Sequence, residues 1–263
     1  MIHDIVKSKS TRLFIILGGF FIANALIAEI IGVKLFSLEK SIGLAPADIR
    51  LFGNSFSFNL TAGVLLWPVV FIMTDIINEY YGPKGVRLLS FLAIILVAYS
   101  FLMFTGAIRL YPADFWAKDY FNGVSDSNKA FAGIFGQSQA IIIASLAAFL
   151  VAQLLDVFIF HKIKKVTGER NIWLRATGST LVSQLIDSFI VLFIAFYVVP
   201  KLMGQSRAWS FSQVMATCVG NYLYKFFVAI ILTPVIYLVH NIIERYLGQN
   251  LAGEMKAAAM RRQ

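Results

Sequence analysis

Cysteine and charge are both scarce in this sequence. Cys218 is the only cysteine among 263 residues, so the chain can form neither an internal disulfide nor a thiolate metal cluster. Charged residues make up 14% of the chain and hydrophobic residues 59%, whereas a typical soluble domain has roughly 25% and 45–50%. So few charges cannot cover the surface of a soluble domain of this size. The composition excludes a disulfide scaffold and a disordered chain, and it predicts a polytopic membrane protein.

Sequence motifs of enzymes are missing too. The chain has no H-E-x-x-H, no G-x-x-x-x-G-K-(S/T) and no G-x-S-x-G segment. Its three histidines, His3, His161 and His240, lie in the N-terminal tail and at the ends of apolar stretches, which disfavours a buried Ser–His pair or a histidine metal site. We therefore expect no enzymatic activity, no metal and no cofactor, and ATP can drive this protein only through another chain.

Long apolar stretches dominate the rest of the sequence. A helix needs about 20 mostly apolar residues to cross a hydrocarbon layer of about 30 Å. Six such stretches occur, at approximately 13–36, 60–80, 86–108, 138–160, 174–199 and 214–239. The prediction is an all-α integral membrane protein in which residues 1–263 form a single domain of six transmembrane helices. The longest connections, 37–59 and 109–137, are long enough to hold a short interfacial helix or to cover a pore.

The net charge of +9 is distributed unevenly along the chain. Fourteen Lys and Arg residues lie in the two tails and in the second and fourth connections, and seven lie in the other connections. Because positive residues accumulate on the cytoplasmic side, this bias places both termini in the cytoplasm. An even number of helices requires both termini on one side, so the two arguments agree. The positive charge is thus explained as a topology signal, and no nucleic-acid partner is expected.

Four ionisable residues lie well inside the apolar stretches: Asp75, Asp156, Asp187 and Lys225. Each costs about 2.5–3.5 kcal/mol at the centre of a membrane helix, so such residues face the bundle interior, pair with one another or line a wet cavity. Function is the default hypothesis for them. An internal ion pair between Lys225 and an aspartate is the purely structural alternative, and it can coexist with a functional role.

Helical spacing groups other polar residues with these four. Asp75, Asn78 and Glu79 stand at i, i+3 and i+4, and thus on one helix face. Similar stripes occur in the fourth, fifth and sixth stretches, whereas two polar residues of the first stretch are five positions apart and are expected to serve different neighbours. The additional candidates from these stretches are Asn24, Glu29, Thr74, Gln153, Ser183, Gln184 and Asn221.

One nine-residue pattern occurs twice. Residues 151–159 read V-A-Q-L-L-D-V-F-I and residues 182–190 read V-S-Q-L-I-D-S-F-I, at an offset of 31. Consecutive antiparallel helices would thus carry the same Gln-x-x-Asp pair. Internal symmetry of this kind is typical of transporters, whose sites lie at the repeat interface. Coincidence among apolar residues is the alternative.

Several segments resemble a known family, the vitamin uptake transporter (VUT) family of YhhQ-type queuosine precursor transporters. The matching segments are W-P-V-V-F-I-M-T-D at 67–75, A-Q-L-L-D-V-F-I-F-H-K at 152–162, A-T-G-S-T-L-V-S-Q-L-I-D at 176–187 and Y-L-Y-K-F-F at 222–227. Asn24 fits the first-helix asparagine of the family, whereas the pair Asn78-Glu79 occurs in only some members. The resemblance covers all six stretches and is weakest in the long connections.

The resemblance implies inward transport of 7-cyano-7-deazaguanine or 7-aminomethyl-7-deazaguanine across the bacterial inner (plasma) membrane. It also implies a six-helix fold similar to the substrate-binding subunits of energy-coupling-factor vitamin importers. A carboxylate can accept the adjacent N–H donors of a guanine-like base, amides and lysine can donate to its carbonyl, and aromatic rings can stack on it. We therefore expect one of Asp75, Asp156 or Asp187 to bind the donor edge. The expected polar contacts are Gln153, Asn24 and Lys225, and the expected stacking residues are Trp67, Phe71 and Tyr222.

Different modes of action remain open at this point. The chain can work alone, by facilitated diffusion or by proton coupling, or it can be the binding subunit of an importer that needs a separate ATPase module. An intramembrane enzyme is disfavoured by the missing nucleophile–base pair. The expected partners are the deazapurine and membrane lipid, and a second copy of the chain can form a homodimer.

Overall fold

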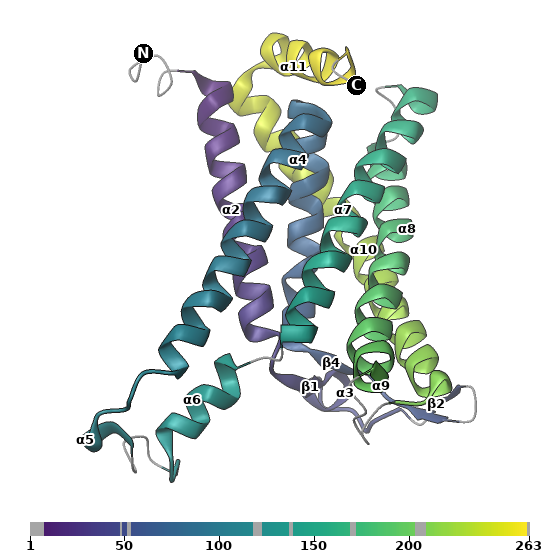
Figure 1. Ribbon diagram of the computed structural model, residues 1–263. Helices are drawn as coiled ribbons and strands as arrows, with labels where there is room; N and C mark the ends of the chain where they lie inside the picture. The colour runs from purple at the N-terminus through teal and green to yellow at the C-terminus, as the bar shows by residue number, and fades with distance from the viewer. Residues whose placement is uncertain are drawn as a thin grey trace.

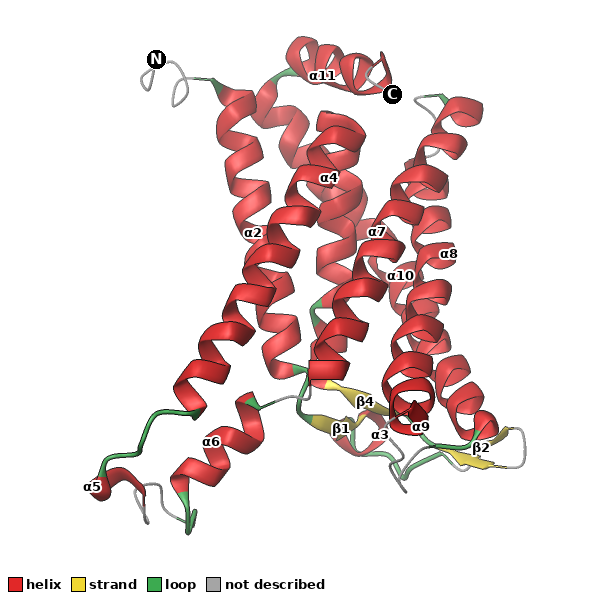
Figure 2. Ribbon diagram, viewed as in Figure 1, coloured by secondary structure: helices red, strands yellow, loops and turns green. Residues whose placement is uncertain are grey.

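The computed structural model describes residues 8–47, 49–51, 54–117, 123–136, 139–168, 172–202 and 209–261. These residues are mostly helical (Figure 2), and five of their helices are long and apolar enough to cross a membrane. The five are α2 (Lys9–Ile31), α4 (Trp67–Ile108), α7 (Gln139–Thr167), α8 (Ile172–Phe193) and α10 (Phe211–Leu247). Helix α8 continues through a π-helical turn, η2 (Ile194–Val198), into α9 (Val199–Leu202). The multi-pass, helical character expected from the composition is thus present.

Helix α4 is 42 residues long because it contains two limbs joined at Gly82. Gly82 has φ +70° and ψ −173°, a backbone conformation that glycine adopts without steric cost. Pro83 follows and disfavours a helical conformation at the preceding residue. The first limb runs from the β4 end of the bundle toward α11, and the second returns toward α5 (Figure 1). The two predicted stretches 60–80 and 86–108 therefore both lie within α4.

The bundle core forms where regularly spaced apolar side chains of α2 meet the first limb of α4. Leu13, Leu17, Phe21 and Ala25 recur every four residues and are all buried, which places them on one helix face. They belong to one apolar cluster with Val70, Met73, Ile76, Ile77 and Tyr80 of α4. Many large apolar side chains on the outer faces, such as Ile15, Leu102 and Ile231, are instead exposed. Extensive exposed apolar surface of this kind fits helices surrounded by lipid.

Short strands cover one end of the bundle (Figure 2). Strand β1 (Leu35–Ser37) pairs antiparallel with β4 (Asn59–Thr61), and β2 (Ile49–Leu51) pairs with β3 (Asn54–Phe56). Helix α3 (Leu38–Ser41) follows β1, and a 3₁₀ turn, η1 (Ala62–Leu65), follows β4.

The beginning of the predicted stretch 60–80 was therefore assigned wrongly. Leu60 pairs with Phe36 in the small sheet, and α4 begins only at Trp67, with Pro68 in its first turn. Proline suits that position because its missing N–H has no helical partner there. The end of the predicted stretch 13–36 likewise forms β1 rather than helix. The start of the stretch 138–160 is only partly testable, since residue 138 lies outside the described residues.

The other end of the bundle is covered by α11 (Gln249–Arg261), which lies across it (Figure 1). This helix was expected to be only a basic tail, but Ala252 and Met255 are buried in the main core. A Cβ atom on Gly82 would lie 3.1 Å from the carbonyl oxygen of Ala259, so α11 closes tightly over the turn of α4. Two short helices, α5 (Asp114–Ala117) and α6 (Ser127–Phe135), follow the second limb of α4.

Candidate functional site

An inner cavity lies between the first limb of α4, α8 and α10. Its apolar wall includes two aromatic side chains, Trp67 and Phe71, whose ring centroids are 6.0 Å apart. Its polar groups come from all three helices. The lining residues are Trp67, Pro68, Phe71, Ile72, Asp75, Thr177, Thr180, Gln184, Lys225, Ala229, Leu232 and Ile236.

Two side chains lining the inner cavity carry buried polar atoms that lack a protein partner. Asp75 is 2% exposed; its Oδ2 accepts a hydrogen bond from Thr180 Oγ1 at 3.4 Å, while Oδ1 has no partner among the described residues. Gln184 is 3% exposed, and neither its amide nitrogen nor its amide oxygen has a partner there. Buried polar atoms are nearly always hydrogen-bonded in folded proteins, because leaving one unsatisfied costs about 1–3 kcal/mol. The cavity therefore offers a carboxylate acceptor and an amide to a polar ligand.

A polar layer lies behind Asp75, away from the cavity lining. Asp156 Oδ1 accepts a hydrogen bond from Ser183 Oγ at 3.1 Å and lies 3.5 Å from Thr180 Oγ1. The Thr180 hydroxyl has one proton, so it can donate to Asp75 or to Asp156 but not to both at once. Thr74 Oγ1 donates to Gln153 Oε1 at 3.2 Å. The layer thus links α4, α7 and α8 through side chains that are all buried.

An outer cavity adjoins the strand-covered end of the bundle. Within it, Lys225 Nζ donates to Asp187 Oδ2 at 2.7 Å, and Ser145 Oγ donates to Glu29 Oε1. Trp67 and Lys225 line both cavities, so they stand at the boundary between them. The lining residues are Ala28, Glu29, Gly32, Leu35, Asn59, Thr61, Val64, Trp67, Ser145, Phe149, Asp187, Ser188, Val191, Leu192, Phe196, Trp209, Thr217, Asn221 and Lys225.

The structure separates the residues proposed from the sequence into three groups. The inner cavity is lined by Trp67, Phe71, Asp75, Gln184 and Lys225. The outer cavity is lined by Glu29, Trp67, Asp187, Asn221 and Lys225. Neither lining includes Asn24, Thr74, Asn78, Glu79, Gln153, Asp156, Ser183 or Tyr222. Asn24 donates to the Phe20 carbonyl of its own helix at 2.8 Å, and Tyr222 packs near Phe226.

The two copies of the Gln-x-x-Asp pattern occupy different environments. Gln153 and Asp156 belong to the polar layer, whereas Gln184 lines the inner cavity and Asp187 pairs with Lys225 in the outer one. The carboxylates therefore have different partners despite their equivalent sequence positions. Within the described ranges, no group of three or more His, Cys, Asp or Glu side chains is placed to hold a metal ion.

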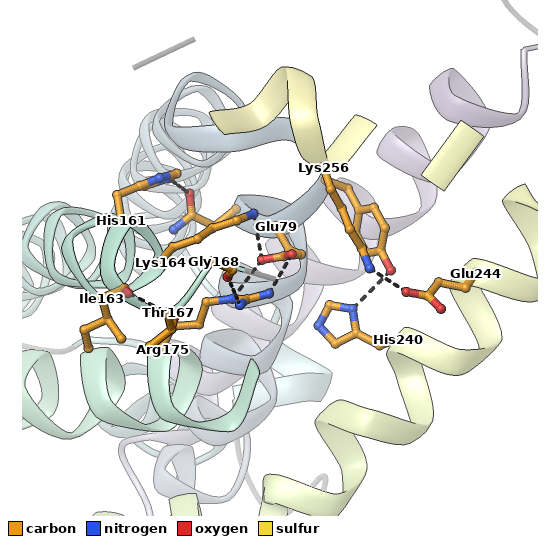
Figure 3. Close-up of polar contacts among 12 residues, drawn as sticks. Glu79, His161, Ile163, Lys164, Thr167, Gly168, Arg175, His240, Glu244 and Lys256 are labelled. Carbon is orange, nitrogen blue, oxygen red and sulfur yellow. Dashed lines mark hydrogen bonds and ion pairs between the residues drawn. The ribbon is translucent and has the colours of Figure 1, made fainter. Parts of the chain in front are cut away.

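A buried charged network lies toward the α11 end of the bundle (Figure 3). Glu79 Oε2 accepts a hydrogen bond from Arg175 Nε at 3.1 Å, and Glu79 Oε1 accepts one from Arg175 Nη2 at 2.8 Å. Lys164 Nζ lies 3.0 Å from the same Oε2. All three side chains are fully buried. The Arg175 Nη1 group also donates to the carbonyl of Gly168 at 2.8 Å. We name Glu79, Lys164 and Arg175 the buried triad.

The buried triad corrects one expectation. Lys164 and Arg175 were counted as charges of a cytoplasmic connection, but both lie within helices and are inaccessible to solvent. His161 and His240 lie at the ends of the predicted stretches, as expected, and both are buried there. His161 Nε2 lies 2.7 Å from Asn78 Oδ1, and His240 Nδ1 lies 3.1 Å from the Tyr80 hydroxyl. The sequence does carry a periodic signal for Lys164, because residues 153, 156, 160 and 164 lie on one helix face.

Comparison with known proteins identifies the family. A family model described as "Putative vitamin uptake transporter" matches residues 61–239. A "Probable queuosine precursor transporter" of Bacillus subtilis is 32% identical over 233 residues, which cover 84% of this chain and 93% of the relative. A protein of the same name from Haemophilus influenzae is 30% identical over 74% of each chain, and the "Queuosine precursor transporter" of Escherichia coli is 26% identical over 75% and 78%.

No solved structure gives a significant match to this chain. The family model covers both limbs of α4, α7, α8 and most of α10, and thus every residue that lines the inner cavity. The chain belongs to the vitamin uptake transporter family, and it is a multi-pass membrane transporter rather than an enzyme.

Proposed function

We propose that this protein imports a queuosine precursor, either 7-cyano-7-deazaguanine or 7-aminomethyl-7-deazaguanine, and binds it in the inner cavity. The names of the relatives supply the substrate class. The observation that carries the proposal is the pairing, in one cavity, of a buried carboxylate oxygen without a partner and an amide without partners. These are the groups that a flat heterocycle with adjacent N–H donors and a carbonyl would satisfy.

The proposed contacts follow from the chemistry of the base. A 7-deazaguanine presents a ring N–H and an exocyclic NH₂ side by side, and Asp75 accepts hydrogen bonds from both. Gln184 donates to the adjacent carbonyl, and Trp67 stacks on the ring. Hydrogen bonds to a charged group contribute about 1.5–3 kcal/mol each, so Asp75 supplies the largest polar share of the binding free energy.

We propose six membrane crossings, since each limb of α4 is long enough for one crossing and Gly82 reverses the chain between them. The α11 end then faces the cytoplasm, and the strand-covered end faces outward from the plasma membrane. The excess of Lys and Arg in the tails and in the second and fourth connections supports this orientation. Under this topology the outer cavity opens to the outside and the inner cavity lies beyond it.

The mode of energy coupling gives two candidate functions that one reconstitution separates. A solitary carrier takes up the precursor when the protein is alone in a liposome. A binding subunit of an energy-coupling-factor type importer binds the precursor but needs a separate ATPase module for uptake. Uptake into liposomes with and without a proton gradient then distinguishes proton coupling from facilitated diffusion.

The substrate site is tested with Asp75→Asn in liposomes that contain only this protein. We expect uptake of both radiolabelled precursors at low concentration to fall at least about 100-fold, which corresponds to about 2.7 kcal/mol, because the amide places an N–H where the base also has N–H groups. Glu254→Gln, on the exposed face of α11, is the matched control and should retain full uptake. Wild-type rates in a folded Asp75→Asn protein would refute the assignment of the inner cavity.

A further inference from the structure

Resting on the proposed function, we infer that each precursor enters together with one proton, and that Asp156 holds this proton while Asp75 holds the base. Asp75 lines the inner cavity, and Asp156 belongs to the polar layer behind it. The Thr180 hydroxyl lies 3.4 Å from Asp75 Oδ2 and 3.5 Å from Asp156 Oδ1. We name Asp75 and Asp156 the carboxyl pair, which this hydroxyl bridges.

The burial of the carboxyl pair requires a proton there. Asp75 is 2% exposed and Asp156 is fully buried, and within the described residues neither forms an ion pair with Lys, Arg or His. An ionised carboxylate away from water is costly without a compensating charge, and two of them bridged by one hydroxyl also repel each other. At least one member of the pair therefore keeps a proton, as happens where two carboxyl groups share a site.

The other titratable side chains around the pair have partners of their own. Glu79, one turn from Asp75, is bonded to Lys164 and Arg175 in the buried triad (Figure 3). Lys225 lines the inner cavity with Asp75 but is bonded to Asp187 at 2.7 Å. Farther along toward α11, the two histidines that face α4 contact its polar side chains; they are His161 of α7, at Asn78, and His240 of α10, at Tyr80. A proton, rather than one of these cations, thus neutralises the pair.

Two buried amides beside the carboxyl pair have unpartnered atoms. Gln153 stands three positions before Asp156 on the same face of α7, is 1% exposed, and its Nε2 has no partner among the described residues. Gln184 lines the inner cavity with Asp75 and Thr180, and neither of its amide atoms has a partner there. Unsatisfied buried atoms are costly, so this region suits groups that arrive and leave. Gln184 serves the base, and Gln153 offers an N–H donor to Asp156 when that carboxyl is ionised.

A proton on Asp156 prepares Asp75 for the base. The protonated carboxyl donates to Thr180 Oγ1, and Thr180 donates its own proton to Asp75 Oδ2, so each donor has one acceptor. Asp75 is then the ionised member of the pair. Its Oδ1, which has no partner in the described part of the chain, is open to the N–H groups of the precursor. The precursor therefore binds when Asp156 is protonated.

The same path releases the base. Asp156 passes its proton to Thr180 Oγ1 while the Thr180 proton moves to Asp75, so Asp156 becomes ionised and Asp75 becomes neutral. The protonated Asp75 presents a donor where the base also has donors, which weakens binding, and the base leaves. The proton then leaves Asp75 through the inner cavity. One proton is taken up and one is released for each base, and no further reactant is needed.

The test follows radiolabelled 7-cyano-7-deazaguanine in liposomes that contain only this protein, with the membrane potential held at zero. When the outside is about one pH unit more acidic than the inside, the wild type should accumulate the precursor about tenfold, as one proton per base requires. Asp156→Asn keeps a neutral side chain that cannot take up or release a proton. It should give no accumulation, while its exchange of external for internal precursor at equal pH stays within about threefold of wild type.

Thr180→Val and Thr180→Ser form the matched pair. Valine keeps the shape of threonine without the hydroxyl, whereas serine keeps the hydroxyl that bridges the carboxyl pair. We expect accumulation to be lost in Thr180→Val and retained in Thr180→Ser. Because these variants leave both carboxyl groups in place, they decide the question even where Asp156→Asn fails to fold.

The outcomes separate this inference from the proposed function. A wild-type protein that exchanges the precursor at equal pH but does not accumulate it would overturn proton coupling and leave the proposed function standing. Accumulation of about tenfold in Asp156→Asn or in Thr180→Val would overturn the assignment of the proton to this path. A wild-type protein that neither exchanges nor accumulates the precursor would overturn the proposed function and this inference with it.

Discussion

The buried triad makes a quantitative prediction for Glu79→Gln. This substitution keeps the size of the side chain but removes the Glu79 carboxylate, which contacts both Lys164 and Arg175 within 3.1 Å. At 3 Å and an effective dielectric constant of about 20, one such charge pair is worth about 5 kcal/mol of Coulomb energy, before desolvation is subtracted. Removing one partner of a buried ion pair typically costs about 3–5 kcal/mol, because the remaining charge stays buried. All three side chains are fully buried here, so we expect a loss in this range.

The assay heats purified protein in detergent to a series of temperatures. Size-exclusion chromatography of the heated samples then measures the fraction that is still folded. For a chain of this size about 1 kcal/mol shifts the Tm by roughly 2–4 °C, so Glu79→Gln should lower the Tm by roughly 6–20 °C. Adding Lys164→Met removes one of the two cations that had been paired with Glu79 and should restore part of that loss. A Tm within 2 °C of wild type for Glu79→Gln, or a double variant less stable than the single one, would refute the reasoning.

Two further predictions concern the strand-covered end of the bundle. Burial alone would raise the pKa of Glu39, but hydrogen bonds from the backbone N–H groups of Phe58 and Ala47 and from Ser37 outweigh it and lower the pKa below 4.5. The ionised Glu39 carboxylate therefore stabilises the folded protein fully above pH 4.5, and this stabilisation is lost as the pH falls through the pKa of Glu39 in the folded state. The Tm difference between wild type and Glu39→Gln should be largest at pH 7 and shrink below pH 4.5. Gly63→Ala should cost about 1–3 kcal/mol, because its Cβ would collide with the Ala28 carbonyl oxygen. Gly19→Ala, whose Cβ would meet no atom within 4 Å, should leave the Tm unchanged or raise it, and equal Tm values for the two alanine variants would contradict this account.

Apolar length and composition are enough to predict the five long helices of the described residues. The signal is strong because each stretch must match the thickness of a bilayer, and the turn between the limbs of α4 is marked in the sequence by Gly82-Pro83. The helix starts are harder to predict. Residues 60–66 are mostly apolar, like the helix that follows them, but Leu60 and Thr61 pair with β1 and 62–65 form the 3₁₀ turn η1. That pairing is a long-range contact that periodicity along the chain does not record.

The grouping of the polar residues is predictable only in part. Stripes at i, i+3 and i+4 correctly place polar side chains on inward faces, but they do not tell which of them line a cavity and which satisfy one another. Asp156 and Asp187 share a sequence pattern, yet one bonds to Ser183 and the other to Lys225. Lys164 and Arg175 were missed as interior residues because a positive charge near the end of a stretch is normally a loop signal. Their partner, Glu79, comes from a helix far away in the sequence.

The tight fit of α11 over the turn at Gly82 has a consequence for how the protein is made. Ala252, Met255 and Ala259 complete the packing of a hairpin whose own residues leave the ribosome much earlier. Until α11 has been synthesised, the apolar ends of α2 and α4 lack their cover at the cytoplasmic surface proposed above. The helices therefore insert into the bilayer before their packing is complete. A fusion or truncation within 249–261 would disturb the packing of the helices without affecting their insertion.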